Sequence, residues 1–198
     1  MLLAALVERS PQVTPEEPAY EVEQRQRVAK AEVRQKQYPS KLTAAEEGPD
    51  QQRARLRMEA ILERDGGREG EGDRTGDERS LDRRLAQRLY LLVRTQTGEW
   101  QLPQREWQSP ESARDGLSAA LEAACGDELT VHPMGNAPLS HMDLDSTRRL
   151  FLWRYLYVSG EVQASGTGDY AWLTKDEIAE RLGGEVGELM KLACGPFP

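Results

Sequence analysis

Residues 100–127 read WQLPQREWQSPESARDGLSAALEAACGD and predict a strand, a turn and a helix in immediate succession. The start of the helix is well specified, because Ser109 can cap it, Pro110 suits its first position, and Glu111 lies near the positive end of its dipole. Gly126 can adopt the left-handed conformation that ends a helix. Local sequence alone therefore specifies this module.

Apolar residues recur along this helix at the spacing of a single face. The stripe consists of Ala113, Leu117, Ala120, Leu121 and Ala124. Residues three and four positions apart lie on the same side of a helix. The helix is therefore predicted to pack against a hydrophobic core.

The sequence around the module alternates between strand-like and helix-like segments. Apolar or aromatic runs predict strands within LYLLVR (89–94), LTVHPMGNAPLSHMDL (129–144), RRLFLWRYLYVSGEV (148–162) and ASGTGDYAWLT (164–174). A helix is predicted after Thr174, which can form a capping box with Glu177, and a short helix is predicted over 185–192. Residues 80–198 are therefore predicted to form an α/β domain.

The first 79 residues have a different composition. Residues 1–64 are rich in Glu, Gln, Arg and Ala, with few large apolar side chains, which predicts a helical extension that depends on a partner for stability. Residues 65–79 are rich in glycine and acidic residues and predict a linker. The opening MLLAALV is too short to span a membrane and could be the remnant of a targeting segment.

Bulk composition limits the classes of function. The chain has 198 residues, a net charge of −8 and an isoelectric point of about 5.0. An autonomous nucleic-acid-binding protein normally carries a basic surface, so this class is disfavoured. The two cysteines form no C-x-x-C motif, which predicts neither a disulfide framework nor a zinc site.

Two sets of polar residues and one short stretch each have more than one interpretation. Five arginines are interpreted as exposed or ion-paired side chains, and contact with RNA phosphates is the alternative. They are Arg83, Arg84, Arg88, Arg148 and Arg149. Another set is a weak candidate for a metal site: His132, His141, Asp143 and Asp145. The GNAP stretch (135–138) is predicted to be a turn that either packs on the domain or docks a partner.

The module resembles the signature of the Nudix hydrolase family, G-x5-E-x7-R-E-U-x-E-E-x-G-U, in which U is a bulky apolar residue. With the first Glu of this box placed on Glu111, its other fixed positions fall on Arg105, Ala119, Ala120, Leu121, Ala123, Ala124, Gly126 and Asp127. Only Glu111, Leu121 and Gly126 match the box. The resemblance implies a Nudix-like α/β/α sandwich with a mixed sheet, preceded by the extended helical N-terminal region.

The positions that would carry Nudix chemistry hold residues that bind no metal. Nudix hydrolysis needs divalent cations held by clustered carboxylates. Glu111 and Glu122 remain, but eleven residues of helix separate their backbones by about 16 Å. Because these two carboxylates cannot share an ion, no catalytic residue, metal site or cofactor is predicted.

Four segments carry a more specific resemblance. In chain order they are DRTGDERSLDRRLAQRLYLLVR (73–94), WQLPQREWQSPES (100–112), GNAPLSHM (135–142) and YAWLTKDEI (170–178). They resemble a Nudix-like family of mitochondrial large-subunit ribosomal proteins. The resemblance implies a non-catalytic structural constituent of the mitochondrial ribosome large subunit, in the mitochondrial matrix.

The same resemblance implies contacts mainly with other large-subunit proteins near the central protuberance. Limited contact with rRNA is allowed, whereas insertion into a membrane is not expected. Two alternative functions follow from the box alone: a divergent Nudix hydrolase, or a nucleotide-binding module that has lost the chemistry.

Overall fold

The computed structural model describes residues 1–13, 69–164 and 168–194, together with residues 19–21, 23–24, 26–28 and 53. The chain divides into two compact units, one formed by Met1–Val13 with Glu69–Pro198 and the other by Thr14–Arg68. The described residues of the second unit are helical, and Arg27 there forms an ion pair with Glu23 one turn earlier. The rest of the helices predicted in this region lies outside the described residues.

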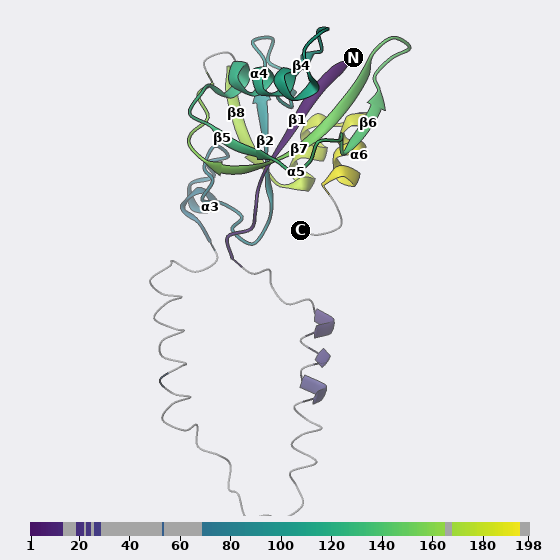
Figure 1. The fold of residues 1–198 in the computed structure, drawn as a ribbon. Coiled ribbons are helices and arrows are strands. Elements are labelled where there is room, and N and C mark those ends of the chain that lie inside the picture. The colour runs from purple at the N-terminus through teal and green to yellow at the C-terminus, as the bar shows by residue number, and fades with distance from the viewer. Residues whose placement is uncertain are drawn as a thin grey trace, which may run out of the picture. The chain divides into compact units, whose positions relative to one another are not determined.

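The described part of the first unit is a mixed eight-stranded sheet with helices on both faces (Figure 1). Its strands are β1 (Leu2–Arg9), β2 (Leu89–Arg94), β3 (Trp100–Gln101), β4 (Gln104–Glu106), β5 (Thr130–Pro133), β6 (Ser140–Asp143), β7 (Arg149–Ser159) and β8 (Asp169–Leu173). Its helices are α3 (Glu71–Thr75), α4 (Ala113–Cys125), α5 (Lys175–Leu182) and α6 (Gly184–Ala193). No helix among the described residues has the length and apolar character needed to cross a membrane.

Strand β1 lies in the middle of this sheet. It runs parallel to β7, with Leu2 opposite Leu150 and Glu8 opposite Leu156. On its other side it pairs antiparallel with β4 near its start and with β2 near its end. Residues 3–9 are each at most 3% exposed, so the first strand of the chain is also among the most deeply buried.

The prediction of a helical extension over 1–64 is therefore wrong for residues 2–9. A strand that is buried on both faces reads as a continuous apolar run, and a short run of this kind cannot be assigned to strand or helix by its periodicity. The parallel partner, β7, begins only at Arg149. A pairing between such distant segments leaves no signal in the local sequence.

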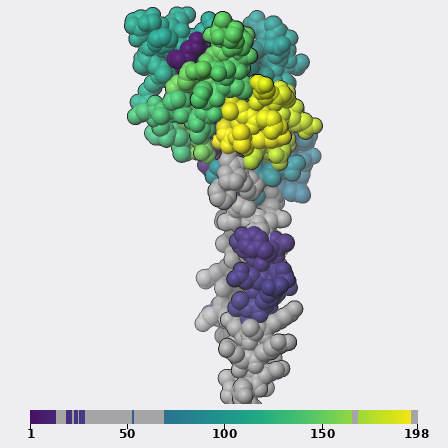
Figure 2. Space-filling view, turned by 90° about the vertical axis from the view of Figure 1, so that its right-hand side faces the viewer, coloured from purple at the N-terminus to yellow at the C-terminus, as the bar shows by residue number. Residues whose placement is uncertain are grey.

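Successive side chains of β1 enter two hydrophobic cores on opposite faces of the sheet. The apolar side chains at positions 3, 5 and 7 share a core with α4, and those at positions 4 and 6 share a core with α5 and α6. This division follows from the two-residue repeat of a strand. Figure 2 shows the C-terminal region, in yellow, at the surface next to the green part of the chain. The predicted α/β/α arrangement with a mixed sheet is confirmed.

The linker predicted over 65–79 is wrong from Glu69 onward, where the chain joins the folded unit. The amide of Gly72 donates a hydrogen bond to the carbonyl oxygen of Asp82 at 2.8 Å. A Cβ atom at Gly70 would lie 2.0 Å from the same oxygen. Glycine here permits a close backbone approach, which composition does not distinguish from flexibility. Residues 65–68 lie outside the described residues.

The buried position of β1 predicts that a Leu6→Ala substitution strongly destabilises the full chain. Leu6 is 0% exposed, and truncation of a core leucine costs about 2–5 kcal/mol of unfolding free energy. Leu192 is 81% exposed, so the matched Leu192→Ala control should change that free energy by less than about 0.5 kcal/mol. Urea denaturation of both variants measures the difference, and equal midpoints would contradict the central placement of β1.

Candidate functional site

The strand–turn–helix module is attached directly to the start of the chain. Glu106, at the end of β4, lies opposite Leu2 of β1. The amide of Trp107 donates to the carbonyl oxygen of Met1 at 3.0 Å, and the amide of Ala5 donates to that of Pro103 at 2.9 Å. The backbone of the loop that leads into α4 is therefore held by β1, a contact that no local pattern in the module predicts.

Helix α4 begins three residues later than predicted. Its N-cap is Ser112 and not Ser109, and the Ser112 hydroxyl accepts a hydrogen bond from the amide of Asp115 at 3.2 Å. Both serines are suitable caps by residue type. Glu111 instead lies in the preceding turn, where its carbonyl oxygen accepts from Nε1 of Trp107 at 2.9 Å. Because Glu111 is engaged in the turn before the helix, Ser112 is the residue that caps α4.

The first glutamate of the box is held by the arginine that stands in place of the box glycine. Nη2 of Arg105 lies 3.3 Å from Oε1 of Glu111, and both side chains are mostly buried, at 29% and 24% exposed. The same oxygen accepts a hydrogen bond from the amide of Gln108 at 3.1 Å. Glu111 therefore has a structural role: it fixes the loop before α4, and its charge is balanced by a cation of the protein itself.

The four alanines in the box divide between the two sides of α4. Ala120 and Ala124 are 3% and 8% exposed and face the core. Ala119 is half-buried and Ala123 is exposed. Neither outward position offers an oxygen or nitrogen ligand. The predicted apolar stripe is confirmed, since the buried residues of the helix include Leu117 and Leu121 as well.

The remaining acids on α4 do not gather around a common point. Asp115 accepts a hydrogen bond from the hydroxyl of Ser112 at 2.7 Å, close to the start of the helix. Glu122 lies two turns further along. Throughout the described ranges, no three His, Cys, Asp or Glu side chains are close enough together to hold a metal ion. The described residues therefore contain no carboxylate cluster that could bind the divalent cations on which the box chemistry depends.

Gly126 ends α4 as predicted. Its φ of 80° is positive, but its ψ of −175° is not that of the predicted left-handed conformation; its amide donates to the carbonyl oxygen of Glu122. A Cβ atom at this position would lie 2.8 Å from Cβ of Gln163. Both the positive φ and the close contact favour glycine. Two of the three matching box residues, Leu121 and Gly126, thus pack the helix and end it.

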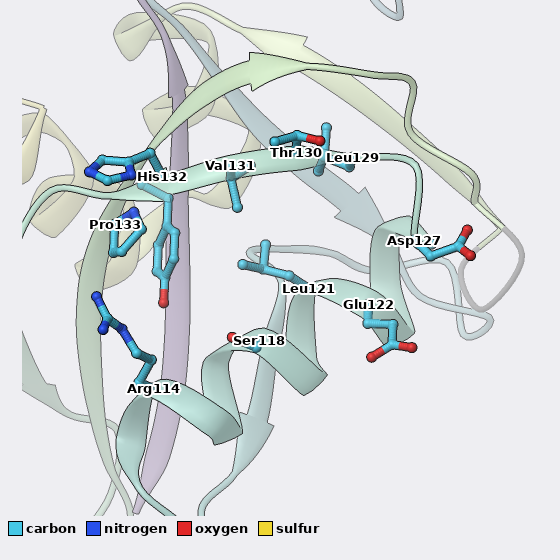
Figure 3. A pocket seen from close by; sticks show the side chains of 12 residues that line it. Arg114, Ser118, Leu121, Glu122, Asp127, Leu129, Thr130, Val131, His132 and Pro133 are labelled. Carbon is cyan, nitrogen blue, oxygen red and sulfur yellow. The ribbon is translucent and has the colours of Figure 1, made fainter.

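A groove of about 630 Å³ lies between the outer flank of α4 and β5 (Figure 3). Leu121 and Val131 point toward each other across it, with Arg114 at one end and Glu122 and Asp127 at the other. The buried Tyr155 also lines it, and burial raises the pKa of its hydroxyl. One cation opposed by two acids is a poor setting for a polyphosphate, which would meet repulsion at the acidic end.

Most of the arginines that the sequence analysis singled out form ion pairs within the domain. Arg84 lies 3.7 Å from Asp73, Arg148 lies 2.7 Å from Asp145, and Arg149 pairs with Asp143. Arg83, which is 7% exposed, pairs with Glu177. The interpretation as ion-paired side chains is therefore confirmed for these four residues.

The candidate metal site is not assembled by the fold. His141 stacks on Phe151, with ring centroids 5.9 Å apart. Asp145 accepts hydrogen bonds from Thr147 and Arg148, which hold the pKa of its carboxyl group far below its usual range. The carboxylate of Asp143 is likewise engaged by Arg149. These groups form local turn and strand contacts and do not converge on an ion.

Comparison with known proteins identifies relatives among ribosomal proteins. No family model matches the chain. Large ribosomal subunit protein mL46 of Rattus norvegicus is 32% identical, with 63% of this chain and 50% of the rat protein covered. The mouse protein of the same name is 32% identical over 60% of this chain and 47% of its own length. The chain is similar to mL46 proteins of three mammals. It spans about half the length of the mL46 proteins that it matches.

Solved structures that match part of the chain include an Ap4A hydrolase and an ADP-ribose pyrophosphatase. A C. elegans Ap4A hydrolase is 14% identical, with a TM-score of 0.46, 54% of this chain covered and 84% of that chain. An ADP-ribose pyrophosphatase from Streptococcus suis is 20% identical, with a TM-score of 0.44 and coverage of 53% and 79%.

Two of the segments that resemble mL46 are joined in space by the buried side chain of Arg83. Arg83, in the first segment, donates to the carbonyl oxygen of Trp172 at 2.7 Å and to both carboxylate oxygens of Glu177, at 3.0 and 2.8 Å. Glu78 binds Arg181 through two hydrogen bonds of 2.9 Å each. The local sequence identifies both segments but not their pairing, because nothing local links residues about 90 positions apart.

Glu177 also closes the capping box of α5. Its carboxylate accepts from the amide of Thr174 at 2.8 Å, and its own amide donates to the Thr174 hydroxyl at 3.4 Å, as predicted. Burial by itself would raise the pKa of Glu177, but the hydrogen bonds from Arg83 and Thr174 outweigh burial and lower it. The folded state therefore favours the ionised carboxylate.

The geometry of α4 predicts that the chain does not hydrolyse nucleoside diphosphate compounds. With Mg²⁺ present, release of phosphate or mononucleotide should stay at the background rate even at high protein concentration. An active Nudix hydrolase assayed in parallel is the positive control. Turnover that disappears in the Glu111→Gln variant would contradict this prediction, because Glu111 is the only box carboxylate position that still holds an acid.

The lowered pKa of Glu177 predicts a pH-dependent contribution to stability. This contribution is fully present above the ordinary carboxyl pKa of 4.5 and is lost as the pH falls through the lower folded-state value. A Glu177→Gln variant should be less stable than wild type at pH 7, and the difference should shrink toward pH 3. Urea midpoints across this range provide the measurement. The exposed Glu185→Gln change is the control, and parallel curves for wild type and Glu177→Gln would argue against the ion pair.

Proposed function

We propose that this chain is a structural constituent of the large subunit of the mitochondrial ribosome, located in the mitochondrial matrix. The observation that carries the proposal is its similarity to mL46 of rat, mouse and cattle, at 29–32% identity. The four segments quoted from the sequence support the same assignment.

We further propose that the chain is not an enzyme. Alanines occupy the Arg, Glu and Glu-Glu positions of the box, and Glu111 is paired with Arg105. What remains of the module packs, caps and ends α4. The module then serves the stability of a domain whose surfaces make contacts in an assembly.

Its contacts in the particle are proposed to be mainly with proteins, near the central protuberance. The net charge of −8 disfavours a large interface with rRNA phosphates. Arg83, Arg148 and Arg149 are engaged by carboxylates of the domain itself, which reduces the positive charge available to RNA. Limited contact with rRNA is compatible with this arrangement.

Co-sedimentation tests the proposal. A tagged full chain that is expressed in mitochondria should migrate with large-subunit fractions after gentle lysis. A Leu6→Ala variant, whose core is weakened, should be depleted from them. Migration of the wild-type chain only at the top of the gradient would refute the assignment to the particle.

Salt dependence tests the kind of contact. Binding through phosphates weakens steeply as counterions are added, whereas binding through apolar protein contacts does not. The chain should therefore remain with the large subunit as salt rises from about 0.1 to 0.5 M. Its release over this range would show that contacts with rRNA phosphates hold it.

A further inference from the structure

The outer edge of the sheet is interrupted by a loop that projects from it. Both β5 and β6 pair antiparallel with β7, one beside each half of it (Figure 1). Pro133 lies opposite Tyr155, and Ser140 lies opposite Leu152. Six residues, 134–139, therefore stand opposite only two residues of β7. We call residues 134–139, MGNAPL, the edge loop.

The edge loop is fastened to the sheet at both ends. The amide of Met134 donates to the carbonyl oxygen of Arg154 at 2.9 Å, and the amide of Leu139 donates to that of Leu152 at 2.7 Å. Pro138 further restricts the backbone near the second attachment. A loop held in this way loses less conformational entropy on binding than a free one.

Every residue of the edge loop is exposed, including its two large apolar side chains. Met134 is 53% exposed and Leu139 is 44% exposed. A Cβ atom at Gly135, between them, would meet no described atom within 4 Å. Of the two interpretations of GNAP, packing on the domain is therefore wrong for the described residues, and docking of a partner remains.

The chemistry of the edge loop fits a protein partner and not RNA. The loop has no charged residue, whereas phosphate contacts rely on lysine and arginine. The nearest arginine on β7, Arg154, is bound to the carboxylate of Glu8 by two hydrogen bonds of 2.8 Å. Exposed Met and Leu side chains are suited to apolar pockets, which bury such anchors at protein interfaces.

The edge loop is also continuous with the groove beside α4. His132 and Pro133 line that groove, and Met134 follows directly. A partner that receives the loop can extend along the apolar side chains of the groove.

We propose that the edge loop is a docking element, whose Met134 and Leu139 insert into apolar pockets of a neighbouring protein in the same particle. This inference rests on the proposed function and specifies one of the surfaces through which the chain is held.

The test compares three full-chain variants in the co-sedimentation experiment. The Met134→Ser/Leu139→Ser variant removes both anchors, and we expect at least a tenfold lower fraction of it bound to the large subunit. Gly135→Ala changes the same loop but keeps the anchors. Val158→Ser removes an apolar side chain of similar exposure, 55%, at the far end of β7. Both controls should bind like wild type, and all three variants should melt at the wild-type temperature.

The outcomes separate the inference from the proposed function. Wild type that fails to sediment with the large subunit overturns the proposed function. Wild type that binds, together with an equally well bound double serine variant, overturns only the docking inference. A photo-crosslinking residue in place of Ala137 gives a second readout. An adduct with a large-subunit protein supports the inference, whereas an adduct with rRNA, or with a second copy of this chain, contradicts it.

Discussion

The parallel pairing of β1 with β7 is the interaction on which the rest of the structure depends. It joins residues 2–8 to residues 150–156 and places the start of the chain between the two helical layers. Because β1 is buried on both faces, its side chains supply both cores at once. The pairing ends at Glu8, a 3% exposed carboxylate that binds Arg154 of β7 through both oxygens. Removal of Arg154 would leave the buried carboxylate of Glu8 unpaired, so this ion pair also favours the correct register.

The same strand explains why the strand–turn–helix module persists without its chemistry. β4 and the loop before α4 are bound to β1 through the backbone, and α4 packs on the side chains of the same strand. Those contacts need a helix of this length with an apolar face and a defined end. They need no carboxylates. Alanine at the outward positions is compatible with these contacts, whereas Leu121 packs in the core and Gly126 has a φ of 80°.

Several charged side chains of this domain stabilise it by forming ion pairs with one another. Arg83 links the segment before β2 to β8 and α5, and Glu78 links the same segment to Arg181. These pairs join segments that are far apart in the sequence, and Arg83 is buried. Its charge is held by a carboxylate and by a carbonyl oxygen together, which is the arrangement in which a buried guanidinium is stable. In the described domain, the arginines that are paired in this way contribute less positive charge to the surface.

The sequence by itself determined the features that depend on near neighbours. These are the apolar face and glycine end of α4, the capping box at Thr174, the strand-forming runs, and the replacement of the box carboxylates by alanine. Only the tertiary structure decided the features that depend on distant partners. They include the role of residues 2–9 as the central strand and the joining of Arg83 to Glu177. The edge loop is of the same kind, because its exposure is set by the register of two strands on β7. A local pattern records propensity and periodicity, whereas pairing between distant segments is fixed by the packing of the whole domain.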